Sequence, residues 1–155
     1  MKLQRGFTLI ELMMVVSITL ILTGASVTAF LNFNKTQSVN NDARNLAAEV
    51  YRVRTLAASL QYPTGCSSLK SYALTSNSDL SGVIVTAKCD PADVAFPEVR
   101  LLTSSVFSQP LNLVFLPGSG YLEGGTNIEI TIKLINDTAV TKKVTVGAYG
   151  TVTNI

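Results

Sequence analysis

The stretch that decides the fold lies at the N-terminus, where Met1-Lys-Leu-Gln-Arg-Gly6 is followed by Phe7-Thr-Leu-Ile-Glu11-Leu-Met-Met-Val-Val-Ser-Ile-Thr-Leu-Ile-Leu-Thr-Gly-Ala-Ser-Val-Thr-Ala-Phe-Leu31. Between Phe7 and Leu31 only Glu11 is charged. A helix of about 20 apolar residues crosses the hydrocarbon core of a bilayer. We therefore predict a transmembrane helix over residues 7–31. A lone carboxylate in such a helix is costly, so Glu11 is a candidate functional residue that needs a partner.

The order of basic, small and apolar residues differs from that of a secretory signal peptide. Lys2 and Arg5 stand at the front, but the small residue Gly6 comes before the apolar run. A secretory signal is cut beyond its apolar region, which is then discarded. A cut after Gly6 would remove only residues 1–6 and would keep the apolar helix. The positive-inside rule places Lys2 and Arg5 in the cytoplasm, so the rest of the chain is expected outside it.

The segment Gly6-Phe7-Thr8-Leu9-Ile10-Glu11-Leu12, with its short basic leader, resembles the processing site of type IV pilins and pseudopilins. The resemblance implies that a prepilin peptidase/methyltransferase cuts between Gly6 and Phe7 and N-methylates Phe7. It also implies that Glu11 guides assembly with other pilin or pseudopilin subunits at an inner-membrane platform. The alternative is a simple lipid-embedded anchor. That alternative accounts for the hydrophobicity but not for the Gly-Phe junction or the position of Glu11.

The helix is predicted to continue beyond the membrane as an amphipathic segment over residues 32–62. Apolar residues recur there at steps of three or four, which is the spacing of one helix face. Tyr62-Pro63-Thr64-Gly65 then carries the residues that end a helix. We expect one helix over residues 7–60, with its apolar stripe packed on the protein's own sheet. The stripe consists of Val39, Ala43, Leu46, Ala47, Val50, Val53, Ala57 and Leu60.

After Gly65 the apolar period changes from 3.6 to two, which is typical of strands. Ile128-Glu-Ile-Thr-Ile-Lys-Leu134 alternates throughout, and Asn136-Asp137-Thr138 is a hairpin turn into the next strand. The predicted fold is therefore α+β, with a pilin-like helix packed on a small antiparallel β-rich head at 63–155. Strands are expected at 70–75, 83–88, 98–103, 111–116, 128–135, 139–146 and 149–153, and loops at 77–81, 90–97 and 104–110.

A second resemblance concerns the C-terminal third of the chain. Residues 111–150 are similar to the end of GspH/FimT-like minor pilins and pseudopilins, with a strand, a Gly-containing turn, a strand hairpin and a closing strand. An antiparallel sandwich of another family would share much of this order.

Cys66 and Cys89 are the two cysteines of the chain. Their separation fits neither a CxxC redox motif nor a four-cysteine metal site. Thiols of an exported chain are expected to pair, so we predict a disulfide that fastens the end of the helix to the first strands. The alternative is a pair of free buried thiols.

Composition narrows the function classes. The chain has no histidine, which excludes Ser-His-Asp and Cys-His nucleophile systems and imidazole metal ligands. The carboxylates Asp90, Asp93 and Glu98 lie close together, but their spacing matches no calcium loop. We expect no catalytic residue, no metal and no cofactor. Removal of Lys2 and Arg5 leaves ten basic against ten acidic side chains, and residues 150–155 hold no basic residue, so no nucleic-acid partner is indicated.

The sequence thus predicts a structural subunit rather than an enzyme. It would sit in the bacterial inner membrane as a single-pass protein, with its head outside the cytoplasm. It would assemble as a minor pilin or pseudopilin into a type IV pilus or a type II secretion pseudopilus. The alternatives are a major or DNA-uptake type IV pilin and a membrane-tethered extracytoplasmic binding domain.

Overall fold

The computed structural model describes residues 8–154, apart from the side chain of Ala25. The chain divides into two compact units, residues 1–35 and 36–155, and the helix α1 (Leu9–Ala58) belongs to both. Gly6 and Phe7, where cleavage and methylation are predicted, lie outside the described residues.

Within the first unit, the described residues form the N-terminal part of α1. Thr8 caps this helix: its Oγ1 accepts a hydrogen bond from the backbone N–H of Glu11 at 3.4 Å, and its carbonyl accepts one from Leu12 at 3.2 Å. A threonine at this position satisfies backbone donors that would otherwise have no partner in the helix. The capping hydrogen bonds of Thr8 therefore explain why the helix begins at Leu9.

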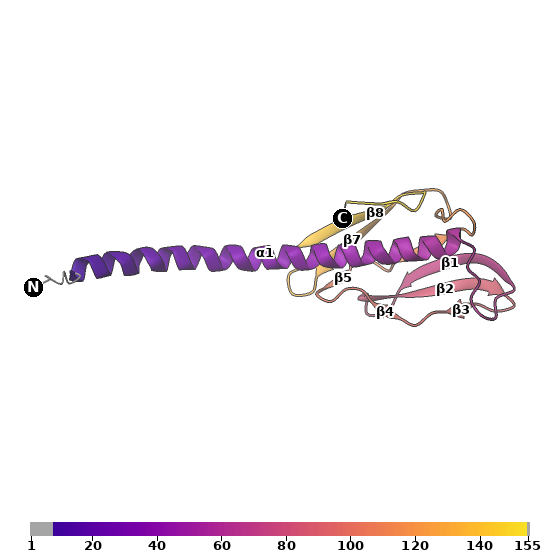
Figure 1. Ribbon diagram of the computed structural model, residues 1–155, viewed down its shortest axis with the longest axis horizontal. Helices are drawn as coiled ribbons and strands as arrows, with labels where there is room; N and C mark the ends of the chain where they lie inside the picture. Colours follow the sequence, from indigo (N-terminus) through magenta and orange to yellow (C-terminus); the bar gives the residue numbers. More distant parts are fainter. Residues whose placement is uncertain (1–7, 155) are drawn as a thin grey trace, which may run out of the picture. The chain divides into compact units, whose positions relative to one another are not determined.

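The second unit holds two antiparallel sheets beside the C-terminal part of α1 (Figure 1). The first sheet has the order β3-β2-β1-β6, with β4 also paired to β2, and the second has the order β5-β7-β8-β9. The strands are β1 (Ser68–Ser76), β2 (Gly82–Asp90), β3 (Val94–Ala95), β4 (Val99–Arg100), β5 (Ser105–Phe107), β6 (Asn112–Phe115), β7 (Ile128–Leu134), β8 (Thr141–Val146) and β9 (Val152–Thr153).

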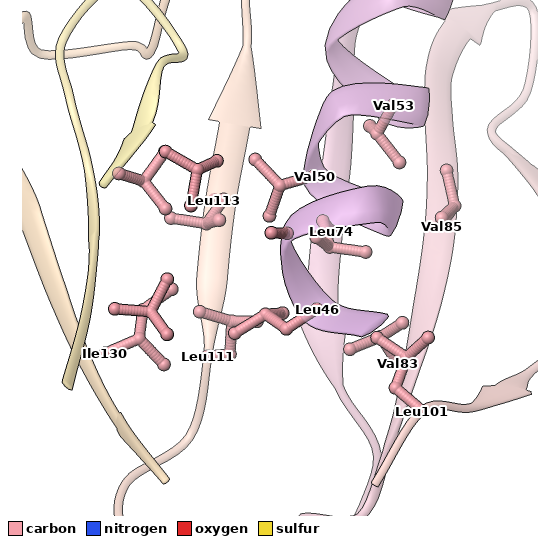
Figure 2. Close-up of a cluster of buried hydrophobic side chains, with 14 of the residues drawn as sticks. Leu46, Val50, Val53, Leu74, Val83, Val85, Leu101, Leu111, Leu113 and Ile130 are labelled. Carbon is pink, nitrogen blue, oxygen red and sulfur yellow. The ribbon is translucent and has the colours of Figure 1, made fainter. Parts of the chain in front are cut away.

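The predicted apolar stripe of α1 forms the middle of the core. Its members from Val39 to Ala57 are all at most 4% exposed. In Figure 2, the side chains of Leu46, Val50 and Val53 point among apolar side chains of both sheets. Leu60 is the exception, since α1 ends at Ala58 and the Leu60 side chain is 46% exposed. The fold class is confirmed: one long apolar N-terminal helix is packed on antiparallel β-sheets.

Several strand boundaries differ from those expected. The segment 104–110 was predicted as a loop but contains β5, and β3 lies inside the predicted loop 90–97. The expected strand 98–103 shrinks to β4 because Leu101 and Leu102 leave the sheet edge and become buried. The strand expected at 149–153 is reduced to β9. The hairpin between β7 and β8 is confirmed, with Ile128 opposite Val146 and Lys133 opposite Thr141.

Two glycines allow turns to close on α1. Gly120 has φ +66°, and a Cβ there would come within 2.9 Å of the Arg54 carbonyl oxygen. Gly150 has φ +71°, and its Cβ would come within 2.7 Å of the Arg54 Cδ. Glycine has no Cβ and adopts a positive φ without steric strain. The stem of Arg54 can therefore lie against both turns, which fastens the helix to loops that are far apart in the sequence.

Candidate assembly helix and its supports

The described part of the predicted membrane segment presents an apolar surface. All its large apolar side chains from Leu9 to Phe33 are at least 47% exposed. Within residues 8–154, α1 alone is long and apolar enough to span a bilayer, a criterion of length and composition, and its most apolar window is wholly exposed. A contiguous exposed apolar surface of this kind marks a membrane or protein interaction site.

The hydroxyl groups in this segment do not interrupt that surface. Ser17 donates to the Met13 carbonyl at 2.8 Å, Thr23 to the Thr19 carbonyl at 2.6 Å, and Ser26 to the Leu22 carbonyl at 2.7 Å. Thr19 likewise donates to the carbonyls of the preceding turn. A hydroxyl proton bonded within its own helix needs no other acceptor in lipid. These polar residues are therefore compatible with burial in a bilayer.

Glu11 is the charged residue in this apolar surface. It is exposed and lies in the first turn of α1, three residues after the capping Thr8. This Thr-x-x-Glu spacing is that of a capping box, and a carboxylate at a helix N-terminus is stabilised by the helix dipole. Among residues 8–154, no basic side chain forms an ion pair with Glu11. The local structure thus orients this residue without neutralising its charge.

Asp42 is a buried carboxylate that the sequence analysis did not identify. It is 1% exposed and lies on the stripe face of α1. Its oxygens accept hydrogen bonds from the N–H and hydroxyl of Thr103 at 3.2 Å, from the Ser104 N–H at 3.2 Å, and from the Ser105 hydroxyl at 2.5 Å. A buried charge is tolerated when it is fully hydrogen-bonded. Asp42 therefore ties the helix to the start of β5.

Glu49 is the second acidic side chain on the buried side of α1, and it is 8% exposed. Arg52 binds it through two guanidinium nitrogens, with 2.8 Å from Nε to Oε2. The hydrogen bond to Glu49 raises the pKa of Arg52, while burial acts in the opposite direction. The helical spacing of the apolar residues could have identified both acids as buried. Asp42 lies three residues after Val39, and Glu49 lies three residues after Leu46.

The carboxylates between β2 and β4 do not form a cation site. Asp90 pairs with Lys70 at 3.0 Å and Asp93 pairs with Lys88 at 2.6 Å. Glu98 accepts a hydrogen bond from the Asn77 amide at 2.6 Å. Among the described residues there is no group of three or more potential metal ligands. Each carboxylate already has a partner within the head.

The predicted disulfide between Cys66 and Cys89 is present. Cys66 follows the end of α1, and Cys89 lies in β2 and is 5% exposed. The bridge therefore fastens the connection after the helix to the first sheet.

The comparisons with known proteins agree with this geometry. The model of the prokaryotic N-terminal methylation motif matches residues 1–27. The crystal structure of the type IV minor pilin FimU from Pseudomonas aeruginosa superposes with a TM-score of 0.54 at 16% sequence identity. The match covers 74% of this chain and 90% of that one. Curated protein sequences gave no match.

The motif match includes the predicted cleavage and assembly residues Gly6, Phe7 and Glu11. The chain thus carries the prokaryotic N-terminal methylation motif over residues 1–27 and shares the fold of a type IV minor pilin.

Proposed function

We propose that this protein is a filament subunit of the minor pilin or pseudopilin kind, assembled through its N-terminal helix. The single observation that carries the proposal is the methylation motif at residues 1–27, which runs directly into an exposed apolar helix surface. A bilayer covers this surface before assembly, and the helices of neighbouring subunits cover it afterwards. The head then remains outside the cytoplasm.

Glu11 is proposed to select the axial position of each incoming subunit. Cleavage after Gly6 gives Phe7 an α-amino group, which is protonated at neutral pH. In a staggered bundle, the amine of an incoming subunit meets Glu11 of the subunit before it. At about 4 Å and an effective dielectric constant of about 20, the attraction is worth about 4 kcal/mol before desolvation. This pairing explains why a carboxylate is tolerated in the apolar segment and why cleavage precedes assembly.

A second part of the proposed function is the type of filament that the subunit joins. The similarity to the type IV minor pilin FimU favours a minor subunit of a type IV pilus. Assembly into a type II secretion pseudopilus stays a prediction that rests on the GspH/FimT-like order of residues 111–150. Both kinds of filament would use the same helix and the same Glu11.

The processing step is tested by the intact mass of the protein extracted from membranes of cells that carry a prepilin peptidase. We expect a mass that lacks residues 1–6 and includes one added methyl group on Phe7. A Gly6→Val variant serves as the uncut reference, since a branched side chain replaces the small residue at the junction. A wild-type protein that retains Met1, or that begins beyond residue 25, would contradict the proposal.

A further inference from the structure

We propose that the hollow between β6 and the first half of β7 binds an extended polypeptide segment from a partner protein by strand addition. The hollow has a volume of about 470 Å³, within the range of protein ligand sites. It is lined by Ser108, Gln109, Pro110, Leu111, Asn112, Ile128, Glu129, Ile130 and Thr131. The proposal does not depend on whether the protein assembles into a filament.

The first wall of the hollow is the outer edge of β6. Ser76 donates its backbone N–H to the Leu111 carbonyl at 3.0 Å, so residues 111 and 113 exchange hydrogen bonds with β1. The alternate residues point their backbone groups away from β1. Val114 does so and accepts a bond from the Glu123 N–H at 2.8 Å. Asn112 faces the same way, and within residues 8–154 its N–H and carbonyl have no such partner.

The second wall is the edge of β7 that β5 leaves uncovered. Leu134 donates to the Val140 carbonyl at 3.0 Å, so the even-numbered residues of β7 bond with β8. The odd-numbered residues face β5, where Ser108 donates to the Thr131 carbonyl at 2.9 Å. Beyond Ser108 the chain turns away through Pro110. In the described part of the chain, the backbone of Glu129 therefore points into the hollow without a backbone partner.

Apolar side chains lie at the base of the hollow, among the polar groups of its lining. Leu111 and Ile130 are each 6% exposed, and Figure 2 shows their side chains beside the core of the head. Ile128 is half-buried next to them. Peptides bind to open strand edges by strand addition, in which main-chain hydrogen bonds supply affinity and alternate side chains contact the surface beside the edge.

The register defines the chemistry of the occupant. A peptide residue opposite Glu129 exchanges two backbone hydrogen bonds with it and directs its own side chain outward, as Glu129 does. The residues before and after it direct their side chains inward, as Ile128 and Ile130 do. The fitting segment is thus an apolar–polar–apolar tripeptide in extended conformation. Because the main chain supplies the affinity, the pattern of the segment determines binding more than its exact sequence.

The test is an NMR titration of the ¹⁵N-labelled full chain in detergent micelles with the capped peptide Thr-Val-Thr-Val-Thr at millimolar concentration. We expect saturable amide shifts at Asn112 and Glu129.

An Asn112→Pro variant removes one N–H that points away from β1. Proline is tolerated at such a position of an edge strand. This variant should weaken binding at least about threefold, whereas Asn112→Ala should bind as the wild type does. A peptide with an N-methylated central threonine should bind at least about threefold more weakly than the parent.

Amide exchange of the peptide-free chain provides a second measurement that does not depend on the probe. The Asn112 and Glu129 amides should exchange at least about tenfold faster than those of Leu113 and Ile130, which bond within the sheets. The absence of saturable shifts at Asn112 and Glu129 would overturn the proposal, as would equal binding of the N-methylated peptide. Protection of both amides only at high protein concentration would assign the hollow to a second copy of this chain and would also overturn it.

Discussion

Two acidic residues on the buried face of α1 have specific polar partners, and one of them, Asp42, attaches the helix to the second sheet of the head. Asp42 receives four hydrogen bonds from three consecutive residues at the start of β5. Glu49 is held by Arg52 on the same helix. Both acids occupy positions where the apolar spacing alone would place another leucine or valine. The core therefore has specific polar attachment points in addition to apolar packing.

The first prediction concerns Asp42. Asp42→Ala leaves the buried Ser105 hydroxyl without its acceptor and also removes the acceptor of the more exposed Thr103 and Ser104 donors. We therefore expect the head to lose about 2 kcal/mol of unfolding free energy. Asn45→Ala is the matched control on the same helix, because Asn45 makes one 3.4 Å hydrogen bond, to the Leu101 carbonyl. It should cost less than about 1 kcal/mol. Denaturant unfolding of both variants measures the difference, and equal losses would contradict the assigned role of Asp42.

The second prediction concerns the titration of Asp93. The hydrogen bond from Lys88 lowers the pKa of this carboxyl below 3.8, and the Cys89 N–H and Lys70 lower it further. Since the folded-state pKa is depressed, the contribution of Asp93 to stability is present above about pH 4 and is lost as the pH falls through the folded value. In Lys88→Met the NMR titration midpoint of Asp93 should rise toward 3.8. In Lys70→Met it should rise less. An unchanged midpoint in Lys88→Met would refute the assigned cause.

At the scale of elements, the buried length of α1 and the β7–β8 hairpin could be predicted from the sequence. Their periodicities follow from which face of each element is buried, and Val50 and Ile132 lie where those patterns place them. The candidate membrane segment could be recognised because residues 7–31 hold one charged residue. The Thr8 cap and the Asp42 contacts were not predicted, since each depends on a single residue and its neighbours in space.

The strand β5 shows why the rest of the head was harder to predict. Its segment is rich in serine and precedes Pro110, which favours a loop. In the structure the hydroxyl of Ser105 is used by Asp42, and Phe107 is buried opposite Ile132 of β7. Partners more than 20 residues away along the chain therefore make this segment a strand. Local composition contains no information about those partners.

The third prediction concerns the bridge between α1 and the first sheet. In the chain-entropy model, the disulfide that closes the Cys66–Cys89 loop contributes about 3 kcal/mol. The double variant Cys66→Ala/Cys89→Ala should lower the unfolding free energy by about that amount. Addition of reductant should lower that of the wild type similarly and leave the double variant unchanged. Labelling of both thiols in exported wild-type protein under denaturing, non-reducing conditions would show that the bridge does not form in cells.

At the scale of the whole molecule, the two units differ in whether their apolar side chains are buried. The second unit buries the apolar stripe of α1 and contains the hydrophobic core of the chain's described residues. The first unit leaves its apolar side chains exposed between residues 9 and 33. A surface of this kind marks a membrane or protein interaction site, and the methylation motif at residues 1–27 overlaps it.

In the proposed function, the N-terminal helix assembles the protein into a filament and Glu11 directs this step. The most direct measurement compares wild type, Glu11→Ala and Glu11→Gln in filaments sheared from cells, as the fraction of each processed protein that co-purifies with the filament. Both variants should enter the membrane and lose residues 1–6 as the wild type does. The account predicts that both are at least about tenfold depleted from the filament fraction, because neither offers a charge to the Phe7 amine. Incorporation of both variants at the wild-type level would contradict it.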